Sequence, residues 1–173
     1  MVSKKGITPP EKLQSHHSFK TFDSGKPVLD EWLQKRALRN EETGASRTYV
    51  VCIKKQVVAF YALAVGSIEV IKAPGKIRRN MPDPIPVMIM GRLAVDQKYQ
   101  GGGIGRGLLR DAVLRIVQAA EIAGIRAILV HALDEDAKTF YQRCGFQASP
   151  LASMTLMITV ADALKAFSKK TQR

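Results

Sequence analysis

Cysteine, acidic side chains and long apolar stretches are all scarce in this sequence of 173 residues. The two cysteines, Cys52 and Cys144, lie far apart and no CxxC pair occurs, which argues against a zinc site and a disulfide framework. No apolar run approaches the ~20 residues of a membrane-spanning helix, and residues 1–20 hold charges and prolines without an apolar segment. We therefore expect a cytoplasmic protein with no membrane partner and no metal, in which both cysteines are buried.

The shortage of acidic residues leaves a strong positive charge. Lys and Arg number 27 against 15 Asp and Glu, so the formal net charge is +12. This balance favours a polyanionic partner and disfavours polyamines or aminoglycosides, which need an acidic acceptor cleft; basicity that serves only solubility is the alternative. The charge is clustered in one expected helix, one expected loop and the end of the chain: Lys35, Arg36 and Arg39; Lys72, Lys76, Arg78 and Arg79; Lys169, Lys170 and Arg173.

The apolar pattern predicts a single domain, residues 1–173, of mixed α/β class. A helix is expected from Pro27 to Gly44, with Ser24 as its cap, because apolar side chains recur there at helical spacing. Residues 71–86, rich in proline and basic side chains, are expected to form a surface loop. The other expected strands span 48–53, 57–70, 87–95, 127–133, 146–148 and 154–160, and the other expected helices span 108–124, 134–145 and 161–167.

Glycines are concentrated after the strand 87–95. Gln100–Gly105 holds four glycines in five positions and leads into a helix, an arrangement that binds phosphate because free N–H groups and the helix dipole point at the anion. A Walker P-loop is excluded by the missing Lys-Ser or Lys-Thr, and the spacing GxGxxG is absent. A merely flexible turn would need fewer glycines. Gln100, Gly103 and Gly105 fit the pattern Gln/Arg-x-x-Gly-x-Gly/Ala.

This pattern, between a strand and a helix, resembles the pyrophosphate motif of the GNAT acetyltransferases. Further stretches extend the likeness over most of the chain: residues 29–33 (LDEWL), 46–50 (SRTYV), 84–88 (PIPVM), 91–96 (GRLAVD) and 140–146 (FYQRCGF). Together they resemble the GNAT toxins of type II toxin–antitoxin systems, the TacT- and AtaT-like group that acetylates aminoacyl-tRNA.

The resemblance implies the GNAT fold, a central mixed, twisted sheet of about six to seven strands flanked by helices on both faces. It implies an acyltransferase that uses acetyl-CoA to acetylate the amino group of aminoacyl-tRNA and so blocks translation. It also implies an antitoxin of the ribbon-helix-helix type, with an acidic tail, as a partner. Exposed apolar positions late in the chain would suit a homodimer.

The resemblance also assigns the site residues. Tyr141 is the general acid that protonates the departing CoA thiolate, a role that suits a phenol of pKa about 10; a packed core aromatic is the alternative. The cofactor is held by the backbone of the strand end and by the glycine turn, with a neighbouring arginine: Leu93, Ala94, Val95, Gln100, Gly101, Gly102, Gly103, Ile104, Gly105 and Arg106. The tRNA contacts are expected from the basic side chains and not from the resemblance: Lys35, Arg36, Lys76, Arg78, Arg79 and Arg92.

A general base is missing from the strand 87–95, which carries no carboxylate. A lysine amine of pKa near 10.4 must lose a proton before it attacks, whereas an α-amino group of pKa about 7.7–8.0 is already partly neutral. Asp96 either acts as a base through water or caps the following turn. Arg92 reaches the mouth of the strand or an internal carboxylate, because burying it unpaired would be costly.

Two other functions stay open. The same scaffold also serves acetyltransferases of protein lysines, N-termini or a small amine. A noncatalytic module that binds CoA or nucleic acid would keep the glycine turn and the basic surface, with Tyr141 only as a core aromatic.

Overall fold

The computed structural model describes residues 6–168, so the basic cluster of Lys169, Lys170 and Arg173 lies outside the described residues. The chain forms two compact units. The first comprises the described residues up to Ala64 together with Gly91–Asp111, and the second comprises Val65–Met90 and the described residues from Ala112 onward.

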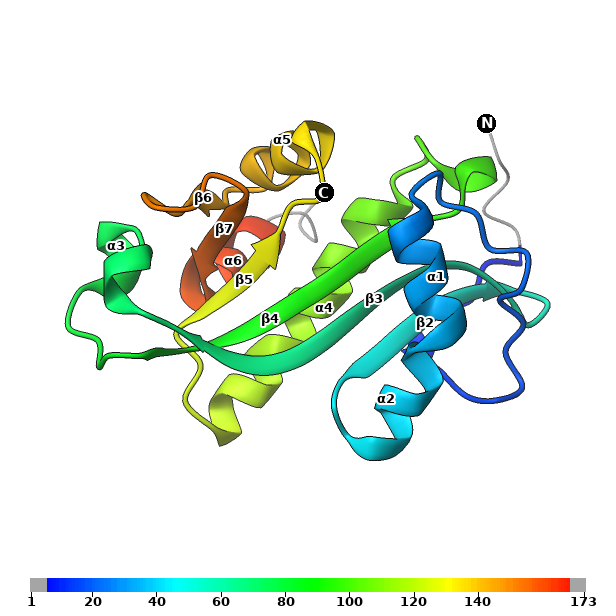
Figure 1. Cartoon of the computed structure of the whole chain (residues 1–173), viewed down its shortest axis with the longest axis horizontal. Helices are drawn as coiled ribbons and strands as arrows, with labels where there is room; N and C mark the ends of the chain where they lie inside the picture. Colours follow the sequence, from blue (N-terminus) through cyan, green and yellow to red (C-terminus); the bar gives the residue numbers. More distant parts are fainter. Residues whose placement is uncertain (1–5, 169–173) are drawn as a thin grey trace. The chain divides into compact units, whose positions relative to one another are not determined.

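The strands form one mixed sheet of seven strands in the order β1-β2-β3-β4-β5-β7-β6 (Figure 1). Strands β4 and β5 pair in parallel, and the pairs β1–β2, β2–β3, β5–β7 and β6–β7 are antiparallel. The expected mixed α/β class and strand number are confirmed. The strands are β1 Glu11–Lys12, β2 Arg47–Ile53, β3 Gln56–Ile68, β4 Ile85–Val95, β5 Ala127–His131, β6 Gln147–Ala148 and β7 Thr155–Thr159.

In the first unit the expected helix 27–44 is two helices, α1 (Pro27–Lys35) and α2 (Ala37–Thr43), which lie beside each other in Figure 1. The backbone of Arg36 between them is not helical, with φ −122° and ψ −32°. Ser24 is not the cap either, because Lys26 holds that position and the Ser24 hydroxyl donates to the Asp30 carboxylate at 2.6 Å. Gly44 ends α2 with φ +81°, as expected.

The first unit has its own apolar core. Leu33 and Ala37 of the two helices pack against Val50, Phe60 and Ala94 of the strands. All five side chains are at most 5% exposed, and burial of this kind supplies about 25 cal/mol per Å² of apolar surface. The packing therefore fixes α1 and α2 against β2, β3 and the end of β4.

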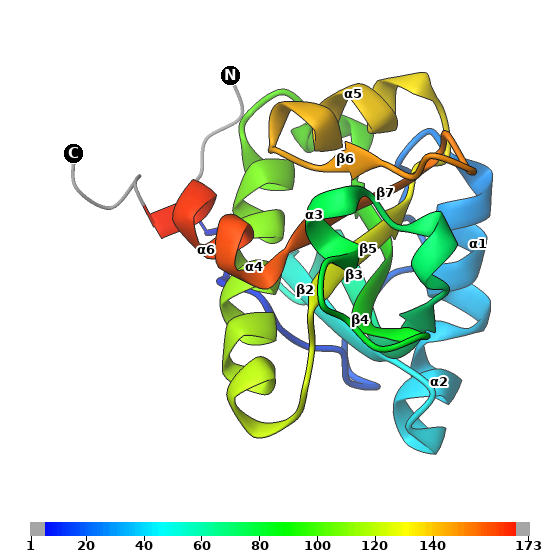
Figure 2. The same cartoon turned by 90° about the vertical axis from the view of Figure 1, so that its left-hand side faces the viewer.

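The second unit places three helices against β7: α3 (Gly75–Arg78), α5 (Glu135–Arg143) and α6 (Val160–Ser168) (Figure 2). The expected loop 71–86 is wrong in part, because it contains the end of a 3-10 turn, η1 (Val70–Lys72), and α3. Ala73 and Ile77 are buried in a core with Ile85 and Leu129, so this segment has an inner face. Four residues of helix are too few to show a periodic pattern.

The glycine turn is followed by α4 (Ile104–Ile122), whose first part belongs to the first unit and whose remainder belongs to the second. Its buried side chains follow helical spacing, as expected: Leu108, Leu109, Ala112, Val113 and Ile116. Of the helices within residues 6–168, none combines the length and apolarity that crossing a membrane requires.

Candidate acetyl-CoA and acceptor site

The end of β4 leads into the glycine turn through Asp96. Each oxygen of the Asp96 carboxylate accepts a hydrogen bond from a backbone N–H group. Its Oδ1 accepts the N–H of Lys98 at 3.0 Å, which caps the 3-10 turn η2 (Gln97–Tyr99), and its Oδ2 accepts the N–H of Asp23 at 3.1 Å. Asp96 is 8% exposed. The expectation that Asp96 caps this turn is confirmed, and both oxygens are occupied by that structural role.

The glycine turn has the backbone that only glycine adopts readily. Gly101 and Gly103 have φ +82° and +87°, values that strain any residue with a side chain. An added Cβ at either position would meet nothing within 4 Å, so the space beside the backbone is open. Ile104, Gly105 and Arg106 form the first turn of α4, where the N–H groups of a helix point outward along its axis. The turn therefore presents an anion-binding helix start.

Gln100 anchors this turn. Its amide nitrogen donates to the carbonyl oxygens of Val95 at 2.8 Å and Ser24 at 2.9 Å. These bonds hold the start of the turn to the end of β4, where Leu93, Ala94 and Val95 lie. The side chain thus positions the loop through its nitrogen.

A cavity of about 300 Å³ lies beside the glycine turn in the first unit. Gly103, Ile104 and Gly107 line one side, and Ile7, Thr8 and Pro10 of the N-terminal segment line another. Thr8 is held there by backbone and hydroxyl bonds to Cys52, 2.9 and 3.0 Å long. Sequence reasoning missed this segment because an isolated bridge and a two-residue strand carry no alternating pattern.

Tyr141 lies in the second unit, near the end of α5. It is 6% exposed and packs against the rings of Phe140 and Phe146, with centroids 5.2 and 5.4 Å away. Burial, and secondarily Cys144, raises the pKa of the Tyr141 hydroxyl well above its usual value. Asp134 caps α5 by accepting the N–H of Ala137 at 2.9 Å, and Gly145 follows the helix with φ +100°, as expected. The helix thereby holds a protonated phenol in an apolar setting.

Known proteins share this arrangement of strand, glycine turn and helix. Residues 44–148 match the family model described as an acetyltransferase (GNAT) domain. The chain belongs to the GNAT acetyltransferase family. Over 158 residues it is 50% identical to a tRNA-acetylating toxin of Mycobacterium tuberculosis (strain ATCC 25618 / H37Rv), a match that covers 91% of this chain and 95% of the relative.

Two solved structures are similar over nearly the whole chain. AtaT complexed with acetyl-methionyl-tRNAfMet has a TM-score of 0.84 and 27% identity, and the match covers 96% of this chain and 99% of AtaT. An AtaT toxin in which one tyrosine is replaced by phenylalanine, bound to the C-terminus of the antitoxin AtaR and to acetyl-CoA, has a TM-score of 0.80 and 27% identity. That match covers 94% of this chain and 98% of the neighbour.

The first unit of this GNAT protein contains three of the expected tRNA contacts. The Arg92 guanidinium lies 4.3 Å from the centroid of the Trp32 ring, and burial lowers the pKa of Arg92. Among the described residues no carboxylate pairs with Arg92, so the indole ring takes the place of the expected internal partner. Lys35 is exposed and pairs with Glu31 at 2.7 Å, and Arg36 stands at the break between α1 and α2.

The other three expected contacts, Lys76, Arg78 and Arg79, lie together at α3 in the second unit. Lys76 forms an ion pair with Asp162 at 2.6 Å, and this hydrogen bond lowers the pKa of Asp162. Arg78 and Arg79 are exposed, and no carboxylate of residues 6–168 pairs with either. The two arginines are therefore better placed than Lys76 to meet a phosphate.

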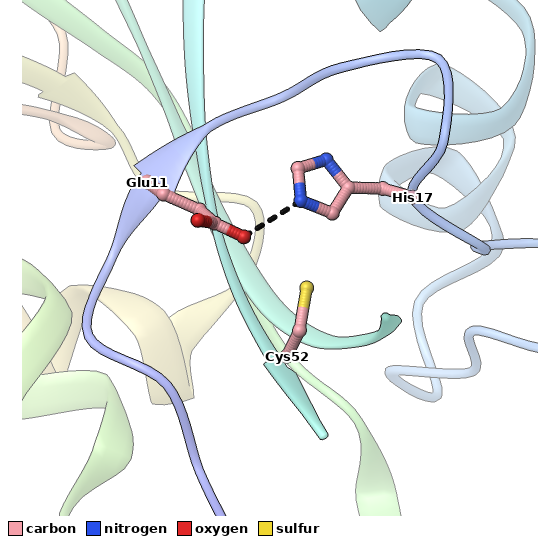
Figure 3. A group of neighbouring side chains, drawn as sticks. All are labelled: Glu11, His17 and Cys52. Atoms are coloured by element: carbon pink, nitrogen blue, oxygen red, sulfur yellow. Dashed lines mark hydrogen bonds and ion pairs between the residues drawn. The ribbon is translucent and has the colours of Figure 1, made fainter. Parts of the chain in front are cut away.

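One cluster offers three kinds of metal-binding side chain: Glu11, His17 and Cys52 have ligand atoms within 4.8 Å of one another (Figure 3). Both nitrogens of His17 are already engaged, because Nδ1 accepts the N–H of Gln14 at 2.9 Å and Nε2 lies 2.7 Å from the Glu11 carboxylate. Burial, with the Glu11 charge, raises the pKa of the Cys52 thiol to about 11. A metal at Nε2 would move the ring proton to Nδ1 against the Gln14 N–H. The cluster fits a hydrogen-bonded tie within the N-terminal segment, beside Cys52 of β2.

Proposed function

We propose that this chain is an acetyl-CoA:aminoacyl-tRNA N-acetyltransferase that acts as a toxin by blocking translation, with residues 1–173 forming one GNAT domain. The observation that carries the proposal is the 50% identity, over 91% of the chain, to a protein named for acetylating tRNA. The solved AtaT complexes with acetyl-methionyl-tRNA and with acetyl-CoA support the same acceptor and donor.

The glycine turn is proposed to hold the cofactor's pyrophosphate. The open, positive-φ backbone at Gly101 and Gly103 and the helix start at Ile104 suit that anion. The proposed contact with the pyrophosphate is completed by Gln100, Gly102, Gly105 and Arg106. The backbone of Leu93, Ala94 and Val95 is proposed to hold the pantetheine arm. Acetyl-CoA, when bound, supplies the acetyl group as a thioester.

Tyr141 is proposed to donate its proton to the departing sulfur. A phenol with a raised pKa is a weaker acid, but the burial that opposes a phenolate also opposes a thiolate in the same apolar surroundings. The difference between the two reference pKa values, about 10 for tyrosine and about 8.5 for a thiol, is therefore the relevant quantity, and it is small. Tyr141 also matches the kind of residue replaced in the AtaT variant.

The attacking amine is proposed to need no carboxylate base. Asp96 has both oxygens bound to backbone N–H groups, and β4 carries no other carboxylate. An α-amino group of pKa about 7.7–8.0 is substantially neutral at physiological pH. This absence favours an aminoacyl ester over a protein lysine as the acceptor.

Partners follow from the same proposal. We propose that aminoacyl-tRNA meets Lys35, Arg36, Lys76, Arg78, Arg79 and Arg92. We also propose that a ribbon-helix-helix antitoxin binds the chain through an acidic C-terminal tail, as the AtaT complex with the C-terminus of AtaR suggests. Exposed apolar side chains such as Ile122 and Leu164 suit a homodimer.

The test is incubation of the protein with labelled acetyl-CoA and total charged tRNA. We expect label on tRNA that is released by mild alkali as N-acetyl amino acids, identified by mass spectrometry. Label on protein lysines, N-termini or small amines would favour the other acetyltransferase activities. Binding of acetyl-CoA without any transfer would favour a noncatalytic module.

A further inference from the structure

A larger cavity, of about 550 Å³, lies within the second unit. The buried and half-buried side chains of its lining form an apolar floor, which includes Ile68, Ile89 and Leu129. The exposed polar residues of the lining form its rim, which includes Lys72, Asp83 and His131. A volume of this size lies within the ~300–1,000 Å³ of typical small-molecule pockets. It exceeds what one side chain fills, and none of the residues proposed to contact the cofactor or the tRNA lines it.

The cavity lies over the paired part of the parallel strands β4 and β5 and extends to the carboxyl end of β5, where the pairing ceases. Their register runs from Val87 with Ala127 to Met90 with Val130, and His131 on the cavity rim is the next residue and the last of β5. In α/β proteins, ligands bind outside the carboxyl ends of parallel strands. The end of the cavity that His131 lines therefore suits a substrate.

The rim is held by hydrogen bonds among its own residues. His131 Nδ1 lies 3.0 Å from Thr155 Oγ1, and the N–H of Ser149 donates to the Thr155 carbonyl at 2.7 Å. The Ser149 hydroxyl donates to the Lys72 carbonyl at 2.6 Å. Three separate segments are thus fixed before any ligand arrives, which lowers the entropy lost on binding.

The floor depends on a glycine. An added Cβ at Gly66 of β3 would overlap the Cδ1 of Ile89. The side chain of Ile89 therefore fits on the floor only because residue 66 has no side chain. The apolar surface is completed at the opening by Leu151, which is 61% exposed, and by Ala152. The cavity therefore offers apolar contact from both its floor and its opening.

The charge of the lining differs from that of the molecule. Lys72 is paired with Glu69 at 2.9 Å, and Asp83 accepts the N–H of Val70 at 3.1 Å with no cation of the described residues beside it. With histidine counted as neutral, the lining holds two carboxylates and one ammonium, whereas the whole chain is +12. Such a lining repels phosphate and attracts a protonated amino group, which loses its proton before it attacks.

We infer that this cavity takes the aminoacyl group of the acceptor, with an uncharged side chain on the apolar floor and the α-amino group at the polar rim. The cavity thereby decides which charged tRNAs are acetylated. This inference rests on the proposed function, since it assigns the part of the acceptor that the basic surface does not bind. Phosphates of the tRNA stay outside the cavity.

Two adjacent exposed residues give a matched test. Ala152 lines the cavity and Ser153, the next residue, does not. We expect Ala152→Trp to fill the opening and lower kcat/KM for the best native acceptor at least about tenfold, because pocket contacts of this size discriminate by roughly 10–200-fold. Ser153→Trp should stay within about twofold. Both variants should keep the thermal stabilisation by acetyl-CoA, which shows that they fold.

A second variant tests the charge. Asp83→Asn keeps an oxygen to accept the Val70 N–H and removes one negative charge, so transfer to aspartyl- and glutamyl-tRNA should rise relative to uncharged aminoacyl-tRNAs. Unchanged acceptor preferences in folded Ala152→Trp and Asp83→Asn proteins would overturn the inference and leave the proposed function standing. If the native chain acetylates no charged tRNA at all, the proposed function fails, and the inference with it.

Discussion

At the scale of single residues, the surroundings of Tyr141 and Asp96 separate their chemistry. Tyr141 is buried among apolar rings and its pKa is raised, so the phenol holds a proton at any pH at which the protein would work. Asp96 is buried too, but its two oxygens accept backbone N–H groups. Tyr141 thus stays protonated and can donate a proton, whereas Asp96 stabilises a turn.

Replacing Tyr141 by phenylalanine removes only the hydroxyl from a packed ring. We expect kcat to fall by about 10²–10⁴, the usual contribution of a general acid, while acetyl-CoA still raises the melting temperature. Tyr99→Phe removes a hydroxyl from the 3-10 turn η2 and serves as the control, with kcat within about twofold of native. Steady-state transfer to charged tRNA measures both, and an unaltered kcat in Tyr141→Phe would remove the tyrosine from the mechanism.

The rate of acetylation should rise once with increasing pH and should not fall again in the mildly alkaline range. A raised pKa means that Tyr141 loses its proton only in strongly alkaline solution, so it causes no fall in rate across the neutral and mildly alkaline range. The amine must be neutral to attack, and its pKa of about 7.7–8.0 sets the rise. Initial rates of acetylation between about pH 6 and about pH 9 would measure this profile. A falling limb below about pH 9 would contradict it.

The sequence could predict the role of a residue whose partners are its neighbours along the chain. It could not predict the role of a residue whose partner is distant in sequence. The caps at Asp96 and Asp134 and the left-handed Gly44 depend on a few adjacent residues. The pairing of Arg92 with the Trp32 ring and of Lys76 with Asp162 joins residues far apart in sequence. No periodic pattern indicates such pairs.

At the scale of elements, length decided what the sequence could predict. Long segments such as α4 and β3 repeat their apolar spacing over several turns or alternations, and their expected spans are close to the observed ones. The two-residue strand β1, the 3-10 turn η1 and the four-residue helix α3 are too short to repeat anything. The break at Arg36 was hidden because apolar positions continue across it.

The glycine turn allows a test within one element. Gly103→Ala forces a side chain onto a backbone with φ +87°, which should cost about 1 kcal/mol of stability and place a methyl group where an anion would approach. We expect the stabilisation by acetyl-CoA to be largely lost. Gly44→Ala is the matched control, since it imposes the same strain at φ +81°, with nothing within 4 Å of the new Cβ, at a position outside the proposed cofactor contact. Thermal melts with and without acetyl-CoA distinguish the two variants. If folded Gly103→Ala gains as much stability from acetyl-CoA as the native chain, the pyrophosphate is bound elsewhere.

At the scale of the whole molecule, the charge of +12 should make tRNA binding depend on salt. We expect Arg78→Gln with Arg79→Gln to weaken binding and to reduce the slope of log K against log salt by about 0.7–0.9 for each phosphate that the protein no longer neutralises. Lys76→Gln should do less, because Lys76 is already paired with Asp162. A double variant of the exposed Lys20 and Lys54 removes the same charge elsewhere. Equal slopes for the two double variants would mean that only the total charge matters.

The charge of the whole molecule also bears on its control. An enzyme that acetylates charged tRNA would arrest the cell that makes it, so we expect a partner to hold the chain inactive until it is released. Exposed basic residues such as Arg78 and Arg79 give an acidic tail a complementary surface, and opposite charges speed association. A disordered tail that folds on docking covers a wide surface, which would block tRNA or acetyl-CoA.

We expect expression of the native chain alone to stop growth, Tyr141→Phe to be tolerated at equal protein level, and co-expression with the antitoxin to restore growth. Adding salt to the purified pair should weaken the complex. Harmless, high-level expression of soluble native protein that acetylates tRNA in vitro would contradict the toxin role and leave the acetyltransferase intact.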